Sequence, residues 1–128
     1  MIYLDTSVAL AHLLGDTRRP PESLWSQPLV ASRLLQYETW TRLNARGLTK
    51  THGADARHLI AMVALVELAP PVLERALEPF PVPVRTLDAL HLATLLFLRD
   101  QAQTLQLATY DERLQQGAVA LGVQLWED

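Results

Sequence analysis

Short apolar runs alternate along the chain with longer segments in which apolar residues recur every three or four positions. The short runs at 2–4, 28–32, 105–109 and 123–126 predict strands, and the run at 66–71 predicts a short strand closed by prolines. The longer segments predict helices at 7–14, 33–46, 54–65, 72–77, 87–98 and 112–121. Residues 15–27 are polar and carry two prolines, which predicts a loop with room for one helical turn. This alternation predicts an α/β fold, a three-layer α/β/α sandwich around a mostly parallel sheet of four or five strands.

Composition narrows the class of protein further. The 128 residues contain no repeat or low-complexity tract, so we expect a single domain over 1–128. The chain has no cysteine, which excludes disulfides and thiolate zinc sites. It shows no signal peptide and no apolar run long enough to span a bilayer. We therefore expect a cytoplasmic protein that does not associate with membranes.

The net charge of −3 argues against indiscriminate binding to nucleic acids. Basic residues are nevertheless concentrated between positions 33 and 57, where five of them stand against two acidic ones. A solvated helical face explains this concentration, and a surface that follows phosphates is the alternative. The basic residues are Arg33, Arg42, Arg46, Lys50 and Arg57.

Asp5 stands where the first strand ends and the next helix begins. Ligands of open parallel sheets bind beyond the carboxyl ends of the strands, so a carboxylate is well placed there for chemistry. Capping of the helix by Asp5, Thr6 or Ser7 is the alternative explanation.

Asp111 occupies the same kind of position, after the strand at 105–109. Thr109 and Glu112 have the T-x-x-E spacing of a capping box. That box leaves Asp111 without a capping role, so we expect its side chain to face the strand ends.

Glu38 lies on the helix predicted at 33–46, between Leu34 and Leu35 on the helical wheel and therefore inside the apolar face. A carboxylate turned toward a core must be paired or bind a cation. An ion pair with Arg42, four residues on, is the structural alternative, although such pairs stabilise helices by only about 0.2–0.5 kcal/mol.

Asp88 is the only acid in the most hydrophobic helix, at 87–98. It lies in the first turn, behind Thr86 as the expected cap, where an acid favours the helix dipole. His91 follows one turn later, and we expect it to be a packed, hydrogen-bonded core histidine and not a metal ligand.

If the strands before Asp5 and Asp111 are neighbours, the four acids can converge in one cleft. Repulsion between carboxylates then requires bound protons or a bound metal. Oxygen ligands without cysteine or paired histidine indicate Mg²⁺ or Mn²⁺, and such ions suit hydrolysis of phosphodiesters.

The stretches "YLDTS", "SRLLQYE", "VRTLDALHLA" and "TYDERL" together resemble the acidic motifs of the PIN domain, specifically of VapC-type toxin ribonucleases. The resemblance covers essentially the whole chain, and "RTLDALHLA" is its most specific part. It implies a Mg²⁺- or Mn²⁺-dependent endoribonuclease acting on structured RNA. The catalytic acids it implies are Asp5, Glu38, Asp88 and Asp111, of which Asp5, Asp88 and Asp111 are the expected metal ligands.

The same resemblance implies supporting hydroxyls, RNA contacts and protein partners. The hydroxyls are Thr6, Ser7 and Thr109, and the candidate RNA contacts are Arg33, Arg42, Arg46 and Arg85. For Arg42 and Arg85 an ion pair with a site carboxylate is an equal alternative. Proteins of this type usually form homodimers and are neutralised by a small antitoxin.

The sequence has alternatives to a nuclease. The first is a PIN-like module that binds RNA or protein without cutting, although binding alone does not require a repulsive acidic cluster. The second is a receiver-like phosphoacceptor domain, which wants paired acids after the first strand and a late lysine, whereas this chain has only Lys50. A haloacid-dehalogenase-like phosphatase is a further alternative, and it needs a second aspartate where Ser7 stands.

Overall fold

The computed structural model describes residues 1–15, 18–101 and 104–127. One sheet contains β1 (Ile2–Leu4), β2 (Leu29–Ser32), β3 (Val63–Val66), β4 (Gln106–Ala108) and β5 (Gln124–Leu125). The strands lie in the order β3-β2-β1-β4-β5, and each neighbouring pair is parallel. The helices are α1 (Thr6–Leu14), the 3₁₀ helix η1 (Glu22–Ser26), α2 (Leu34–Ala45), α3 (Thr49–Ala61), α4 (Pro70–Ala76), α5 (Thr86–Arg99) and α6 (Glu112–Ala120).

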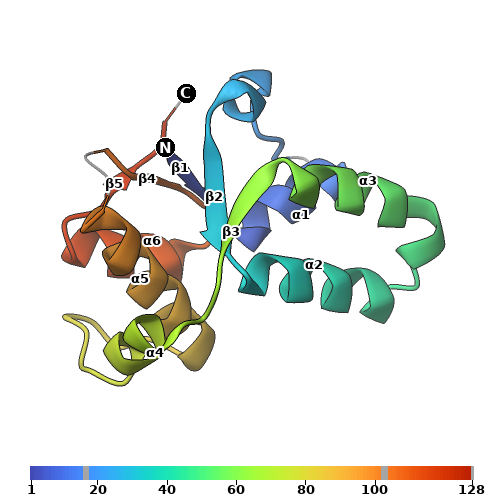
Figure 1. The fold of residues 1–128 in the computed structure, drawn as a ribbon. Helices are drawn as coiled ribbons and strands as arrows, with labels where there is room; N and C mark the ends of the chain where they lie inside the picture. The colour runs from blue at the N-terminus through green and yellow to red at the C-terminus, as the bar shows by residue number, and fades with distance from the viewer. Residues whose placement is uncertain (16–17, 102–103, 128) are drawn as a thin grey trace.

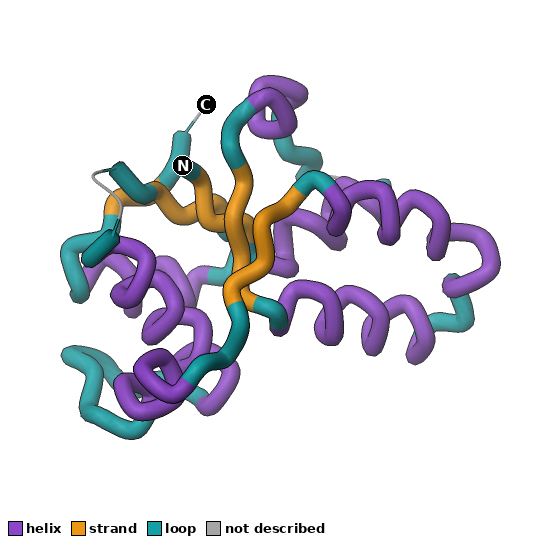
Figure 2. The backbone as a smooth tube through the Cα atoms, viewed as in Figure 1, coloured by secondary structure: helices purple, strands orange, loops and turns teal. Residues whose placement is uncertain are grey.

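Helices cover the sheet on both sides (Figure 1). Helices α1, α2 and α3 lie on one side, and α4, α5 and α6 lie on the other. Figure 2 shows the strands as a thin layer between these two groups of helices. The predicted three-layer α/β/α sandwich with a parallel sheet is confirmed, with five strands.

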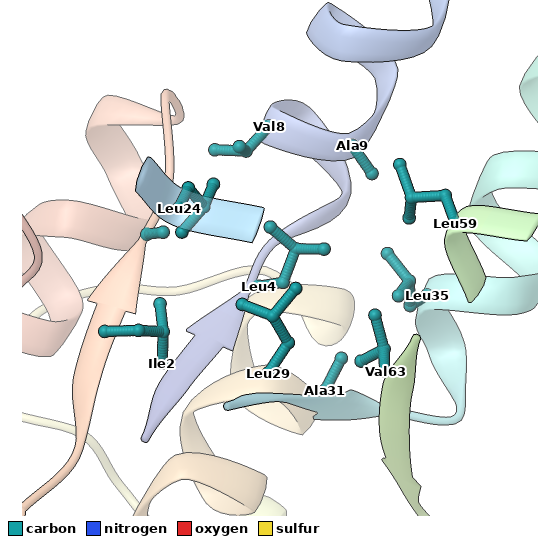
Figure 3. Close-up of a cluster of buried hydrophobic side chains, with 11 residues drawn as sticks. Ile2, Leu4, Val8, Ala9, Leu24, Leu29, Ala31, Leu35, Leu59 and Val63 are labelled. Carbon is teal, nitrogen blue, oxygen red and sulfur yellow. The ribbon is translucent and has the colours of Figure 1, made fainter. Parts of the chain in front are cut away.

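Alternation along the strands produces two hydrophobic cores. Ile2 and Leu4 point to one face of the sheet, and Tyr3 between them points to the other. Figure 3 shows the first core, in which side chains of β1, β2 and β3 pack against Val8 and Ala9 of α1 and against residues of the neighbouring helices. The second core packs β1, β2 and β4 against the buried leucines of α5 and α6.

Most predicted elements agree with the structure to within one or two residues, and η1 is the helical turn expected in the loop at 15–27. Residues 16 and 17 of that loop lie outside the described residues. The helix predicted at 54–65 exists with other bounds, because α3 runs over Thr49–Ala61. The strand predicted at 66–71 is wrong, because β3 runs over Val63–Val66. Residues 63–65 continue the apolar pattern of the helix before them. They nevertheless form a strand, because they pair with β2, beginning with Val63 opposite Leu29. Pro70 and Pro71 begin α4, because proline fits the first helical turn.

No helix among the described residues is both long and apolar enough to cross a membrane.

Candidate active site

The strand order of the sheet reverses at β1. From β1 the chain builds β2 and β3 on one side, and later β4 and β5 on the other. In open parallel sheets, ligands bind in the crevice outside the carboxyl ends of the strands at such a reversal. Asp5 directly follows β1, and Asp111 follows β4, its parallel neighbour. The condition under which the acids can converge is therefore met.

A cavity of about 1110 Å³ opens at this edge of the sheet, and all four predicted acids line it. Asp5 is buried, Glu38 and Asp88 are half-buried, and Asp111 is exposed. Within residues 1–15, 18–101 and 104–127, no three histidine, aspartate or glutamate side chains are grouped closely enough to hold a metal ion. The acids thus share one cavity without forming a tight cluster.

Asp5 is fixed by two of the predicted hydroxyl residues. Its Oδ2 accepts hydrogen bonds from Ser7 Oγ at 2.5 Å, from Thr109 Oγ1 at 2.8 Å and from the Ser7 backbone N–H at 3.3 Å. The last bond makes Asp5 the N-cap of α1. Asp5 therefore caps α1 and also lines the cavity. The cap uses only Oδ2.

Glu38 is held by residues from two other elements. Its Oε1 accepts a hydrogen bond from Thr6 Oγ1 at 2.9 Å and lies 2.8 Å from His91 Nε2. His91 Nδ1 lies 2.7 Å from the hydroxyl of Tyr3. The alternative ion pair with Arg42 is wrong, because Glu38 pairs with Thr6 and His91 instead. The expectation that His91 is a buried, hydrogen-bonded histidine agrees with these contacts.

The acids create a negative potential that reaches His91 and Tyr3. Burial lowers the pKa of His91, but its hydrogen bond to Glu38 and the charges of Glu38, Asp5 and Asp88 outweigh burial and leave that pKa above its ordinary value. The pKa of Tyr3 is raised well above its ordinary value, first by complete burial and then by the charge of Asp5.

Asp88 and Asp111 both interact with the start of a helix. The Asp88 Oδ2 accepts the Arg85 backbone N–H at 3.4 Å, so the N-cap of α5 is Arg85 and not the predicted Thr86. The Asp111 Oδ1 accepts the backbone N–H groups of Arg113 at 2.9 Å and Leu114 at 3.3 Å. Asp111 is therefore the N-cap of α6, and the prediction that it has no capping role is wrong.

Thr109 does not cap α6 as the capping-box spacing suggested. Its hydroxyl donates to Asp5 and accepts the Asp111 backbone N–H at 3.0 Å. Thr109 is buried, and it therefore connects the first acid to the loop that carries the fourth.

Two of the four candidate RNA-contact arginines line the cavity, namely Arg42 and Arg85. Neither forms an ion pair with another described residue, so the alternative that a site carboxylate neutralises them is not seen in the structure. Arg33 instead pairs with Glu67, and Arg46, the C-cap of α2, is not among the residues that line the cavity.

The family model of the PIN domain matches residues 2–120. The chain belongs to the PIN-domain family. The predicted resemblance to the PIN domain is thereby confirmed over nearly the whole chain. Among curated proteins, no sequence matches it significantly.

The fold of this PIN domain is similar to those of solved toxin structures. VapC20 of Mycobacterium tuberculosis, described as a toxin that cleaves the sarcin-ricin loop, has a TM-score of 0.67 at 25% identity. The alignment covers 91% of this chain and 94% of that one. A toxin-antitoxin complex from Klebsiella pneumoniae shares the fold, with a TM-score of 0.68, 18% identity and 94% of each chain covered.

The sequence of this PIN domain did not reveal every polar residue around the cavity. Arg113 lines it without having been singled out, because it lies in an ordinary amphipathic helix. Tyr3 was read only as part of an apolar strand, and yet its hydroxyl bonds to His91. Its hydroxyl group could have indicated this role: all residues of β1 are buried, and a buried hydroxyl requires a hydrogen-bond partner inside the protein.

Proposed function

We propose that this PIN-domain protein is a VapC-type toxin, an endoribonuclease that uses Mg²⁺ or Mn²⁺ to hydrolyse phosphodiester bonds in RNA. The observation that carries the proposal is that four carboxylates from separate segments line one cavity where the strand order reverses. Arg42 and Arg85 line the same cavity without ion pairs among the described residues, so their charges are available for phosphates. The description of VapC20 as a toxin that cleaves the sarcin-ricin loop supports RNA as the substrate.

The donor set of the cavity fits a hard divalent cation. In each of the four acids one carboxylate oxygen accepts hydrogen bonds from the protein, and the other accepts none from the described residues. Carboxylate oxygens are the ligands that Mg²⁺ and Mn²⁺ prefer. A bound cation would offset the repulsion among these carboxylates. We assign the ion to Asp5, Asp88 and Asp111.

A divalent ion supplies an activated water and stabilises the leaving oxygen of a phosphodiester. The protein supplies positions and charges. Glu38, with its Oε1 held by Thr6 and His91, has its Oε2 available to accept a hydrogen bond from the attacking water. Arg42 and Arg85 bind the phosphate and offset the negative charge that the acids impose on it.

The partners and location follow from the same family and are likewise proposals. We propose that residues 1–128 form one cytoplasmic domain that assembles as a homodimer. A small antitoxin is the proposed protein partner, supported by the similarity in fold to a toxin-antitoxin complex.

The test is incubation of total RNA with the purified protein, with Mg²⁺ and with a chelator in its place. Asp5→Asn and Asp88→Asn each remove a charge from the proposed metal site, and we expect both to lower the cleavage rate at least 100-fold, a loss typical of removing an essential catalytic group. Asp55→Asn makes the same chemical change on an exposed face of α3, so this control should cleave like the wild type.

Circular dichroism must show that each variant keeps the wild-type fold. Full cleavage by both Asp5→Asn and Asp88→Asn would remove the basis of the site assignment. RNA that the wild-type protein binds but never cuts, with either ion, would favour the non-catalytic binding module.

A further inference from the structure

A second hollow, of about 580 Å³, adjoins the cavity that the four acids line. Both hollows are lined by Asp5, Glu38, Arg42, Leu87 and Asp111. Since they share these residues, they are two arms of one cleft. Three of the four acids lie where the arms join.

The two arms differ in chemistry. Beyond the shared residues, the first contains Arg85 and Arg113 beside the acids Asp88 and Glu112, and we call it the arginine arm. The second contains Leu10, Leu34 and Tyr37, and we call it the tyrosine arm. A chain that passes over the acids therefore meets charged side chains, two arginines among them, in one arm and a tyrosine and two leucines in the other.

Exposed apolar side chains stand directly beside two of the acids. Tyr37 precedes Glu38 on α2 and is 64% exposed, and Leu87 precedes Asp88 on α5 and is 48% exposed. Neither side chain belongs to either of the two hydrophobic cores. Packing of this domain therefore does not explain why a tyrosine and a leucine occupy these positions.

We propose that the tyrosine arm stacks one unpaired nucleobase next to the scissile phosphate, with the base lying against the ring of Tyr37. The inference rests on the proposed nuclease function and deepens it. RNA joins an anionic backbone to flat, apolar base faces, and the cleft offers cations and an exposed aromatic ring on either side of the acids. The base must be unpaired, because bases in a duplex are stacked on each other and have no free face. Tyr37 thereby restricts cleavage to loops and other single-stranded positions.

An apolar segment of a partner protein would fit the tyrosine arm alone. Two arginines are what favour RNA. Arg42, where the arms join, and Arg85, in the arginine arm, have no ion pair among the described residues, so both can bind the anionic backbone.

The test measures binding separately from cleavage, using a short single-stranded RNA in the presence of a chelator. We expect Tyr37→Ala to weaken binding roughly 5- to 150-fold, the range for loss of one base-aromatic stack. Tyr37→Phe keeps the ring and should bind within about twofold of the wild type. Met62→Ala removes an exposed apolar side chain at the end of α3, outside both arms, and serves as the matched control.

A series of the same RNA with one base removed at each position locates the stacked base. At one position the loss of the base should weaken binding to the wild type and to Tyr37→Phe, and have no further effect on Tyr37→Ala. Cleavage by the wild type should occur next to that position.

Unchanged RNA binding by Tyr37→Ala would overturn the proposal. If that variant bound RNA like the wild type but lost affinity for a partner protein, the tyrosine arm would be a protein-binding site and the proposal would also be wrong. The nuclease function can fail independently: RNA bound through Tyr37 but never cut keeps the base site and contradicts only the proposed activity.

Discussion

Hydrogen bonds connect the backbone of β2 to the carboxylate of Glu38 through two buried side chains. The Ser32 backbone N–H donates to the Tyr3 hydroxyl at 3.3 Å, and the same hydroxyl lies 2.7 Å from His91 Nδ1. An ionised carboxylate only accepts hydrogen bonds, so His91 Nε2 donates its hydrogen to Glu38. Glu38 is therefore oriented from the core of the domain and not only from its own helix.

Tyr3→Phe tests this connection. The ring of Tyr3 is fully buried, and the substitution leaves the Ser32 N–H and His91 Nδ1 without their partner. We expect the free energy of unfolding to fall by about 1–3 kcal/mol, the cost of buried polar groups left unpaired. Urea denaturation measures the loss. Tyr37→Phe deletes the same atom from a side chain that is 64% exposed, and should change stability by less than about 0.5 kcal/mol. Equal effects of the two substitutions would mean that the buried hydroxyl contributes nothing.

At the scale of elements, the start of α2 is tied to the end of β3. The Arg33 Nε donates to Glu67 Oε1 at 3.0 Å, and the Arg33 backbone N–H donates to the carbonyl of Val66 at 2.8 Å. The hydrogen bond from Arg33 lowers the pKa of Glu67. Arg33 was a candidate RNA contact, but its ion pair with Glu67 gives it a structural role instead.

The lowered pKa of Glu67 predicts the pH dependence of its contribution to stability. A carboxyl whose pKa falls on folding stabilises the protein above its unfolded pKa of about 4.5, and that contribution is lost as the pH falls through the folded value. We expect Glu67→Gln to be less stable than the wild type at neutral pH, with the difference disappearing in acid. Urea denaturation across a pH series measures this. Glu74→Gln, on α4 and without an ion pair among the described residues, should show no such convergence.

The elements also show what a sequence pattern can predict here and what it cannot. Helical and strand periods located most elements because one face of each is buried. Val63–Val66 was missed because a short apolar run after a helix has no period of its own, and only its pairing with β2 makes it a strand. The site behaves similarly. Three of its acids stood out at element ends and Glu38 on the apolar face of a helix, whereas the contacts among Tyr3, Glu38 and His91 join positions far apart in the chain.

At the scale of the whole molecule, the order β3-β2-β1-β4-β5 is what makes four scattered acids into one site. It places the strand before Asp5 directly beside the strand that leads to Asp111. Helices α2 and α5 cover opposite faces of the sheet and bring Glu38 and Asp88 to the same edge (Figure 1). The fold thus concentrates negative charge at one place, and this concentration opposes folding until a cation or protons offset it.

That opposition predicts a stabilising effect of divalent ions. An ion that binds only the folded protein raises its stability by about 2.7 kcal/mol at a concentration 100 times Kd, and each kcal/mol raises Tm by roughly 2–8 °C for domains of this size range. We expect Mn²⁺ or Mg²⁺ to raise the Tm of the wild type as the ion concentration increases, at constant ionic strength set with NaCl. Differential scanning calorimetry measures the shift. Asp5→Asn loses a proposed ligand, so its Tm should rise less with the ion than that of the wild type, whereas Asp55→Asn should follow the wild type. An identical shift in Asp5→Asn and the wild type would place the ion outside the cleft.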